Sequence, residues 1–343
     1  MSESKQHKKL NILMILDVLK EHTDENHKLL QKEIEDMVAK KFFPLTIRRR
    51  AVKSNLDCLI EAGYGIEYTK PDRKNGEPGG WYLAREITDA ELHLLIDGLL
   101  FSKYIPYSQC KALIGKLEGL SSKHFRSRHD LPENQPENKS LFLTIEILNE
   151  AIKKGKRVAF QFIYYGTDKK PQTVTNKDGT PHIYRVSPYE IVVTNGRYYL
   201  ICAHSKGTGL FNYRLDYIHE IALLENENRR PIKEMANCRG GRLDLSAYMR
   251  EHIYMYGGES RRVTFRADLR VNANIVGHII DWFGKDVRFS EIAEDAITAT
   301  VSVNEQAMLY WALQYGMAVE ILKPIELREK VREAVASMWE KYK

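Results

Sequence analysis

The chain has 343 residues, of which 43% are hydrophobic and 29% charged; this composition is typical of globular proteins, and the length predicts two or three domains. The apolar run at residues 12–16 is far shorter than the roughly 20 residues of a membrane-spanning helix, and the N-terminus lacks the apolar core of a secretory signal. The four cysteines are scattered without a CxxC pair, which favours a cytoplasmic protein. We therefore expect no membrane partner, no metal and no cofactor.

The formal net charge of +6 is unevenly distributed along the chain. Residues 1–90 carry 16 basic and 15 acidic side chains, residues 91–259 carry 24 and 19, and residues 260–343 carry 12 of each. The charge balance therefore best supports an anionic ligand in the middle of the chain. The neutral last segment gives no electrostatic argument for binding an anion, and we interpret it as a domain for assembly.

Three helical patterns open the chain. Apolar residues recur with spacings of three and four at residues 12–19, 30–38 and 52–60. The third predicted helix has Thr46 as its N-cap and ends at Gly63, a residue type that tolerates the left-handed conformation. Two short apolar segments, residues 65–69 and 80–84, then predict a β-hairpin. Together these elements predict a winged helix-turn-helix DNA-binding domain at residues 1–87.

The start of the third predicted helix is basic. Six basic side chains and no acidic one lie from Lys40 to Lys53. A recognition helix presents its first turns to the major groove, where arginine reads guanine and binds phosphate. The predicted DNA contacts are Arg48, Arg49, Arg50, Lys53, Ser54, Arg73 and Lys74. Ser54 is a weaker candidate, and Arg73 and Lys74 lie at the hairpin tip. The alternatives are a solvated helix face and a solvent-exposed turn.

Residues 88–140 are predicted to form a helical linker. The pattern Thr88-x-x-Glu91 is a capping box that opens a helix over residues 88–104, and residues 111–120 continue the helical pattern. Residues 127–140 contain two prolines and many polar side chains, which makes them the strongest candidate for a domain boundary.

The pattern changes from helical to alternating in residues 141–230. A short amphipathic helix at 141–152 precedes strands predicted at 158–165, 182–193, 197–204 and 210–224. Asn195-Gly196 between two apolar runs predicts a two-residue hairpin turn. These residues predict a small antiparallel β domain with a leading helix, followed by a connector at residues 231–259.

The last segment, residues 260–343, alternates strands with helices. Strands are predicted at 262–267, 296–303 and 319–322, and helices at 272–283, 305–315 and 324–341. This order predicts a small α+β sandwich, to which we assign dimerisation.

Motifs in four parts of the chain together resemble one known family. R-R-A-V-K-S-N-L-D-C-L-I-E-A-G begins at Arg49, and G-G-W-Y-L covers residues 79–83. R-x-x-P-Y begins at Arg185, N-G-R-Y-Y-L at Asn195, Y-R-L-D-Y-I at Tyr213 and V-E-I-L at Val319. In this order they resemble the recognition helix, wing, WYL domain and C-terminal extension of bacterial WYL-domain transcriptional regulators. The chain departs from the family pattern at Ala51, Ser54 and Asn55 in the helix, and at Tyr198, where the family has tryptophan.

The resemblance implies an α+β multidomain fold with a winged helix-turn-helix, an Sm-like small β-barrel and a C-terminal α+β sandwich. It also implies that the barrel, which is the WYL domain, senses a ligand. In several members of the family this ligand is a nucleic-acid species such as single-stranded DNA.

Strand alternation suggests which side chains meet that ligand. In the strand at 197–204, Arg197 and Tyr199 face away from the set that contains Leu200 and Cys202. A tyrosine can stack on a base while an arginine holds a phosphate. The predicted ligand contacts are Arg185, Tyr189, Arg197, Tyr199, His204 and Arg214. The alternatives are sheet packing for Tyr199, an ion pair with Asp216 for Arg214, and an ordinary strand histidine for His204.

The sequence carries no GxxxxGK[ST] and no HExxH motif, so we expect no enzymatic activity. We interpret the chain as a ligand-responsive, sequence-specific transcription regulator that binds double-stranded DNA at a palindromic operator as a homodimer. Its ligand would be anionic, either a nucleotide or a single-stranded nucleic acid. The alternative is an accessory nucleic-acid-binding module that modulates a defence or effector enzyme.

Overall fold

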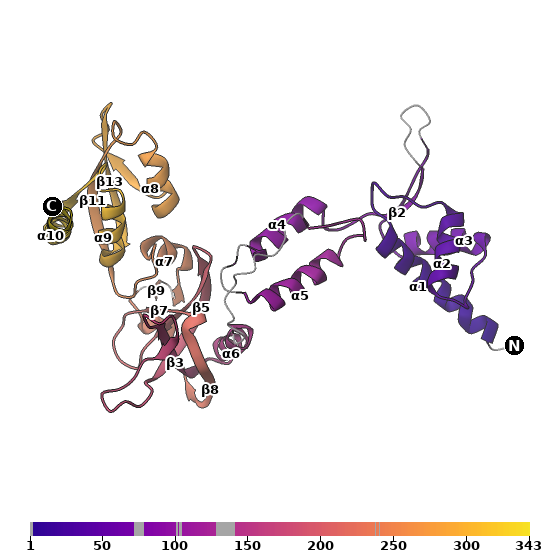
Figure 1. Cartoon of the computed structure of the whole chain (residues 1–343), viewed down its shortest axis with the longest axis horizontal. Helices are drawn as coiled ribbons and strands as arrows, with labels where there is room; N and C mark the ends of the chain where they lie inside the picture. Colours follow the sequence, from indigo (N-terminus) through magenta and orange to yellow (C-terminus); the bar gives the residue numbers. More distant parts are fainter. Residues whose placement is uncertain are drawn as a thin grey trace. The chain divides into compact units, whose positions relative to one another are not determined.

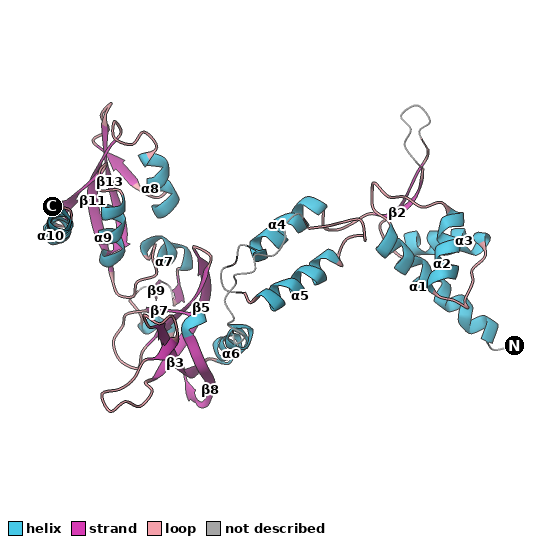
Figure 2. Cartoon of the chain, in the orientation of Figure 1, coloured by secondary structure: helices cyan, strands magenta, loops and turns pink. Residues whose placement is uncertain are grey.

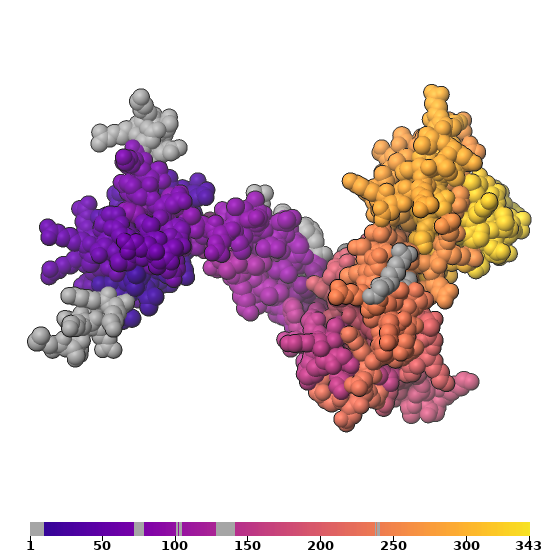
Figure 3. All heavy atoms as spheres, turned by 180° about the vertical axis from the view of Figure 1, so that it is seen from behind, coloured from indigo at the N-terminus to yellow at the C-terminus, as the bar shows by residue number. Residues whose placement is uncertain are grey.

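A computed structural model describes residues 3–71, 79–100, 102, 105–127, 141–236, 238–239 and 241–343. The chain divides into two compact units, Met1–Asn138 and Lys139–Lys343, which are described separately (Figure 1; Figure 3 shows the chain from behind). Within the described residues, no helix combines the length and apolar character needed to cross a membrane.

The first unit begins with three helices and a two-stranded hairpin. Helix α1 (Glu3–His22), α2 (Gln31–Lys41) and α3 (Arg49–Glu61) surround a core in which Ile15, Ile34 and Leu56 are fully buried. Strands β1 (Ile66–Thr69) and β2 (Gly80–Leu83) pair antiparallel beside them. Leu29 extends this sheet through backbone hydrogen bonds with Trp81 of 2.8 and 2.9 Å. The predicted winged helix-turn-helix is confirmed.

Helix α3 starts later than its sequence predicts. The N-cap is Arg48 in extended backbone, so the prediction of Thr46 was wrong by two residues. The physical reason is Ile47, whose side chain is buried in the core while the backbone is still extended. Gly63 has φ +85°, as expected for the residue that ends this helix.

Two further helices complete the first unit. Helix α4 (Asp89–Leu100) and α5 (Tyr107–Glu118) lie side by side (Figure 1). The capping box is confirmed, because the Thr88 N–H donates to Glu91 Oε2 at 2.8 Å and the Glu91 N–H to Thr88 Oγ1 at 3.3 Å. The Lys123 N–H donates to the Glu21 carbonyl at 2.8 Å, which ties this helical pair to the end of α1.

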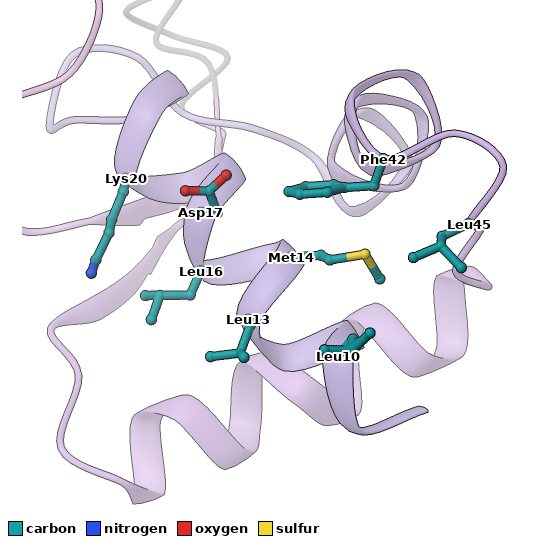
Figure 4. A pocket seen from close by; sticks show the side chains of 8 residues that line it. All are labelled: Leu10, Leu13, Met14, Leu16, Asp17, Lys20, Phe42 and Leu45. Atoms are coloured by element: carbon teal, nitrogen blue, oxygen red, sulfur yellow. The ribbon is translucent and has the colours of Figure 1, made fainter. Parts of the chain in front are cut away.

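A shallow apolar pocket of about 430 Å³ lies on α1 and the segment that follows α2 (Figure 4). Its lining residues are Leu10, Leu13, Met14, Leu16, Asp17, Lys20, Phe42 and Leu45. None of the residues predicted to contact DNA lines this pocket.

The second unit begins with helix α6 (Leu141–Lys154) and a curled sheet (Figure 2). Its strands are β3 (Lys156–Tyr165), β4 (Pro171–Thr173), β5 (Ile183–Thr194), β6 (Arg197–Ala203), β7 (Phe211–Arg214) and β8 (Ile218–Asn228). The strand order is β8-β3-β5-β6-β7, with β4 beside the far end of β3. The three-residue helix η1 (Leu215–Tyr217) joins β7 to β8, so the chain passes directly from one end of this strand order to the other, as in the Sm-like barrel that was predicted.

Two sequence predictions for the barrel have different outcomes. Asn195 and Gly196 have φ of +51° and +71°, which confirms the two-residue hairpin turn. The single strand predicted at 210–224 was wrong, because η1 interrupts it. Leu215 is fully buried at this interruption, where the chain must turn sharply to pass from one end of the sheet to the other.

The connector after the barrel packs over β6. It contains η2 (Ile232–Glu234), β9 (Cys238–Arg239), β10 (Arg242–Leu243) and α7 (Leu245–Glu251). Its Met235, Tyr248 and Met255 pack in one cluster with Ile201 and Ala203 of β6. Strand β6 is therefore buried on both faces from Leu200 to Ala203, whereas strand alternation predicted one buried face.

The C-terminal domain has the order β-α-β-β-α-β-α. Its elements are β11 (Ser260–Asp268), α8 (Ile275–Phe283), β12 (Arg288–Ser290), β13 (Ala296–Asn304), α9 (Glu305–Gln314), β14 (Val319–Lys323) and α10 (Ile325–Lys341). The antiparallel sheet order β12-β13-β11-β14 is that of a ferredoxin-like fold. This confirms the α+β sandwich; the sequence pattern missed β12, which has only three residues.

One face of this sheet forms the core of the domain. Val263 and Phe265 of β11 are fully buried in a cluster with Ile279 of α8, Trp311 of α9 and Leu327 of α10. The connector reaches the same core through Ile253, only two residues before Met255 in the barrel cluster. His252 is buried and lies in the sequence between α7 and Ile253. Its Nδ1 lies 2.9 Å from the Tyr248 carbonyl oxygen, and its Nε2 lies 3.1 Å from the Gly258 carbonyl oxygen.

Candidate nucleic-acid and ligand sites

The first turns of α3 present an exposed basic surface. Arg48, Arg49 and Arg50 are all exposed, whereas Val52 and Leu56 are buried against the other helices. The first turn contains no acidic side chain. Positive charge beside the N-terminal end of a helix dipole is unfavourable for the helix, so these arginines do not stabilise α3 through its dipole.

The remaining residues predicted to contact DNA differ in their surroundings. Lys53 Nζ lies 2.5 Å from Asp57 Oδ1 and 4.5 Å from the centre of the Trp81 ring, so its charge is already engaged between α3 and β2. Ser54 is exposed one residue further along the helix. Arg73 and Lys74 lie outside the described residues.

Two of the predicted ligand arginines are held by carboxylates. Arg185 is exposed and lies 3.0 Å from Glu227, which also binds Arg157 at 2.7 Å. Arg214 makes a two-point contact with Asp216, at 3.1 Å from Nε and 2.7 Å from Nη2. The ion pair left open by the sequence is therefore present.

The connector covers part of the predicted ligand face. Tyr189 is only 7% exposed, and its hydroxyl donates to the Arg230 carbonyl at 3.1 Å. Burial raises the pKa of Tyr189. Tyr199 packs against the same cluster, as in the sheet-packing alternative, and Arg197 is half-buried near the Asn195-Gly196 turn. Tyr189 and Tyr199 were expected on an open face of the sheet, and this expectation is corrected because the connector packs there. Alternation along a strand does not reveal which distant segment of the chain packs on it.

Aromatic rings, all partly exposed except the buried Phe160, form a cluster that the sequence did not predict. Tyr213 lies at its centre, with ring centroids 5.2 Å from Phe162, 5.3 Å from Phe160 and 5.4 Å from Tyr184. Tyr217 continues the cluster 5.7 Å from Phe162. The common parity of Tyr213 and Tyr217 was the available signal, but only strand pairing brings in the rings from β3 and β5.

Charged and titratable groups border this aromatic cluster. The Arg214 guanidinium lies 4.0 Å from the centre of the Tyr217 ring. His204 Nε2 lies 2.9 Å from the Tyr213 hydroxyl. Burial, followed by the charges of His182 and Arg157, lowers the pKa of His204, and burial raises the pKa of Tyr213. Which of the two groups donates in the contact between Tyr213 and His204 depends on the tautomer of the imidazole.

Replacing Arg157 by glutamine should raise the pKa of His204, because one of the positive charges that lower this pKa is lost. In the native protein that pKa lies below the value of about 6.5 in an unfolded chain, so the unfolded state takes up the proton first. The contribution of His204 to stability is then complete above pH ~6.5 and falls as the pH drops through the folded pKa. NMR titration of the His204 ring measures its pKa in the native protein and in the variant. A native pKa at or above ~6.5 would contradict this account.

A metal-binding site is not found in the part of the chain that the structure describes. No group of three His, Cys, Asp or Glu side chains there could hold a metal ion. Cys58, Cys110, Cys202 and Cys238 form no disulfide with one another, and burial raises the pKa of Cys202.

Comparison with known proteins identifies two domains. Residues 144–223 match the WYL domain family, and residues 264–339 match the WCX domain family. The Bacillus subtilis (strain 168) protein YobV, described as an uncharacterized HTH-type transcriptional regulator, is 24% identical over 171 residues. This match covers 50% of each protein, so the chain spans about half the length of its curated relative.

Two solved structures are also similar over most of the chain. Proteasome accessory factor B/C (PafBC) of Arthrobacter aurescens is 15% identical with a TM-score of 0.28, over 96% of this chain and 48% of that one. A CRISPR Cas-related protein is 13% identical with a TM-score of 0.38, over 99% of this chain and 81% of that one. The domain matches confirm the resemblance read from the sequence: the chain is a WYL-domain protein in which a WCX domain follows the WYL domain.

Proposed function

We propose that this protein is a ligand-responsive, sequence-specific DNA-binding regulator of transcription. The observation that carries the proposal is the exposed, acid-free arginine cluster at the start of α3 in a winged helix-turn-helix. The similarity to an HTH-type transcriptional regulator supports it. The proposed division of labour is DNA binding at residues 1–87, a helical linker at 88–140, ligand sensing at 141–230, a connector at 231–259 and dimerisation at 260–343.

In this proposal α3 enters the major groove. Arg48, Arg49 and Arg50 contact bases and phosphates, Ser54 lies on the next turn, and Lys53 contributes by exchanging Asp57 for a phosphate. The DNA-backbone contacts predicted for Arg73 and Lys74 fall on residues that the structure does not describe.

Helix α10 supports a homodimer. Its second half exposes Val335, Met338, Trp339 and Tyr342 at spacings of three and four residues, which is one face of a helix. The same helix carries Glu333 before this stripe and Lys341 within its last turn. A second copy packed antiparallel would bring opposite charges together at both ends of the stripe, so we propose that this face is the dimer contact.

The proposed ligand is a nucleotide or a single-stranded nucleic acid bound beside the aromatic cluster. Partly exposed rings supply stacking surfaces, and Arg214 supplies a guanidinium 4.0 Å from the centre of the Tyr217 ring. Arg185 of β5 and Arg197 of β6 are further proposed contacts. Asp216 and the Tyr217 ring orient Arg214, and His204 offers a polar contact from the opposite side of Tyr213. Tyr189 and Tyr199 would act from within the connector cluster, as supports and not as direct contacts.

Selection of bound fragments from genomic DNA by the full-length protein tests the function. The expected result is enrichment of a discrete duplex site whose footprint shows two symmetric half-sites, as a dimeric helix-turn-helix protein requires. Binding of single-stranded oligonucleotides without any enriched duplex site would contradict the proposal. That outcome would favour an accessory module that modulates another enzyme.

A further inference from the structure

The helices of the WCX domain pack on one face of its sheet, and the end of α7 from the connector borders the other face. The odd-numbered residues of β11 and β13 form the core, so the even-numbered ones lie on the opposite face. On that face Arg262 pairs with Ser302, Thr264 with Thr300, and Arg266 with Thr298 across the two strands. Arginine and hydroxyl side chains therefore predominate on this open face, which also carries the carboxylates of Asp268 and of Glu320, the register partner of Arg266.

One row of polar side chains crosses all four strands. Arg288 of β12 is the register partner of Thr300, Thr300 of Thr264, and Thr264 of Lys323 in β14. The two hydroxyls at the centre of the row lie 3.0 Å apart. Because neighbouring strands are about 4.8 Å apart, the backbone positions of the two outer cations are separated by about 14 Å.

A cavity of about 860 Å³ lies over this row. The sheet supplies Arg262, Arg288 and Lys323 to its lining, and the end of α7 supplies Arg250 and Glu251. Arg250 is paired with Asp286, another lining residue, at 3.1 Å. The cavity thus adjoins the connector as well as the sheet.

The charge in the cavity is positive although residues 260–343 are neutral overall. Arg262, Arg288 and Lys323 are exposed, and within the described part of the chain no carboxylate lies within 4.0 Å of any of them. Glu251 is the one lining carboxylate that is not already paired with Arg250. The cations in the cavity lining therefore outnumber the acids there, while Asp268 and Glu320 lie on the same face of the sheet outside the lining.

The chemistry of this face favours phosphate over a nucleobase. Guanidinium and ammonium groups bind phosphate oxygens through charge-assisted hydrogen bonds, and the threonine and serine hydroxyls are additional donors. The rings in the lining, Phe283 and Phe289, pack against the core of the domain and do not belong to the polar rows. The face therefore offers no platform for stacking a base.

We propose that the open face of the WCX sheet is a second anion site, which binds phosphate groups spaced over several ångströms through Arg262, Arg288 and Lys323. The phosphates come either from a single-stranded nucleic-acid backbone or from a nucleoside polyphosphate. This site is separate from the winged helix and from the aromatic cluster of the WYL domain, and it does not depend on their roles.

The test is residue-resolved chemical footprinting of the full-length protein. Acetylation of Lys323 and phenylglyoxal modification of Arg262 and Arg288 are measured by mass spectrometry, with and without ATP or a (dT)20 oligonucleotide. At least one of these probes should slow modification of all three residues severalfold. Protection by ATP alone assigns a small phosphorylated ligand, whereas stronger protection by the oligonucleotide assigns a nucleic-acid backbone.

Variants separate this site from other anion-binding surfaces. In the double variant Arg262→Ala, Arg288→Ala, the ligand concentration that half-protects Lys323 should rise at least about tenfold, since each arginine supplies charged hydrogen bonds. The matched control is Arg266→Ala, on the same strand and face but opposite Glu320 and outside the cavity lining. Failure of both probes to protect Lys323, or an equal loss in the control, would overturn the proposal.

Discussion

Replacing Arg49 and Arg50 together by alanine is expected to lower affinity for the duplex operator by on the order of a hundredfold or more. Each arginine that reads a base or binds a phosphate contributes about 1–3 kcal/mol. Both side chains are exposed and make no core contact, so the fold should be retained. Removing two positive charges from the N-terminal end of α3 should, if anything, stabilise the free helix.

Fluorescence anisotropy across a range of salt concentrations measures this effect. If both arginines bind phosphate, the slope of log affinity against log salt should fall by about 1.8, whereas a base contact leaves the slope less changed. Lys32→Ala is the control, because Lys32 is an exposed cation on α2 that is already paired with Asp36 at 2.9 Å. Unchanged operator affinity in the double arginine variant would refute the assignment of α3 as the recognition helix.

The second large effect concerns the core of the WCX domain. Trp311 is fully buried, with ring centroids 4.9 Å from Phe283 and 5.2 Å from Phe265. Its replacement by alanine should reduce the free energy of unfolding by about 3–5 kcal/mol, because the cavity left among these rings cannot fully collapse. Urea unfolding followed by far-UV circular dichroism would show this as a lower transition midpoint.

Phenylalanine at the same position provides the comparison. Trp311 Nε1 is buried without a hydrogen-bond partner in the described structure, so Trp311→Phe loses ring volume but no hydrogen bond. Its cost should be clearly smaller than that of alanine. A loss below about 1 kcal/mol in Trp311→Ala would mean that this ring does not organise the core.

The sequence predicted most elements because their periodicity is local. Helices α1 to α3 were found from the spacing of apolar residues that are buried in the structure. The errors arose where tertiary packing decides the local conformation. Ile201 and Ala203 are buried by a connector that contacts them from elsewhere in the sequence, and η1 interrupts a strand because the barrel must close there.

The candidate sites were predictable to different degrees for the same reason. The arginines of α3 are consecutive in sequence, so their common exposure could be anticipated. The neighbours of Tyr213 come from strands distant in sequence, whereas the ion pair of Arg214 with Asp216, two residues away, was among the alternatives that the sequence offered. In the WCX domain the counted charge cancels, but cations on alternate positions of β11 and at the sheet edges gather on one face.

The short distance along the chain between Ile253 and Met255 has a mechanical consequence. One residue belongs to the core of the WCX domain and the other to the cluster on the WYL barrel, with His252 fixed between carbonyl groups beside them. Rotating one domain against the other would pull a buried side chain from its core, at a cost of several kcal/mol. Rotation of the two domains about this connection is therefore energetically costly. A displacement of the barrel is expected to be transmitted to the four-stranded sheet.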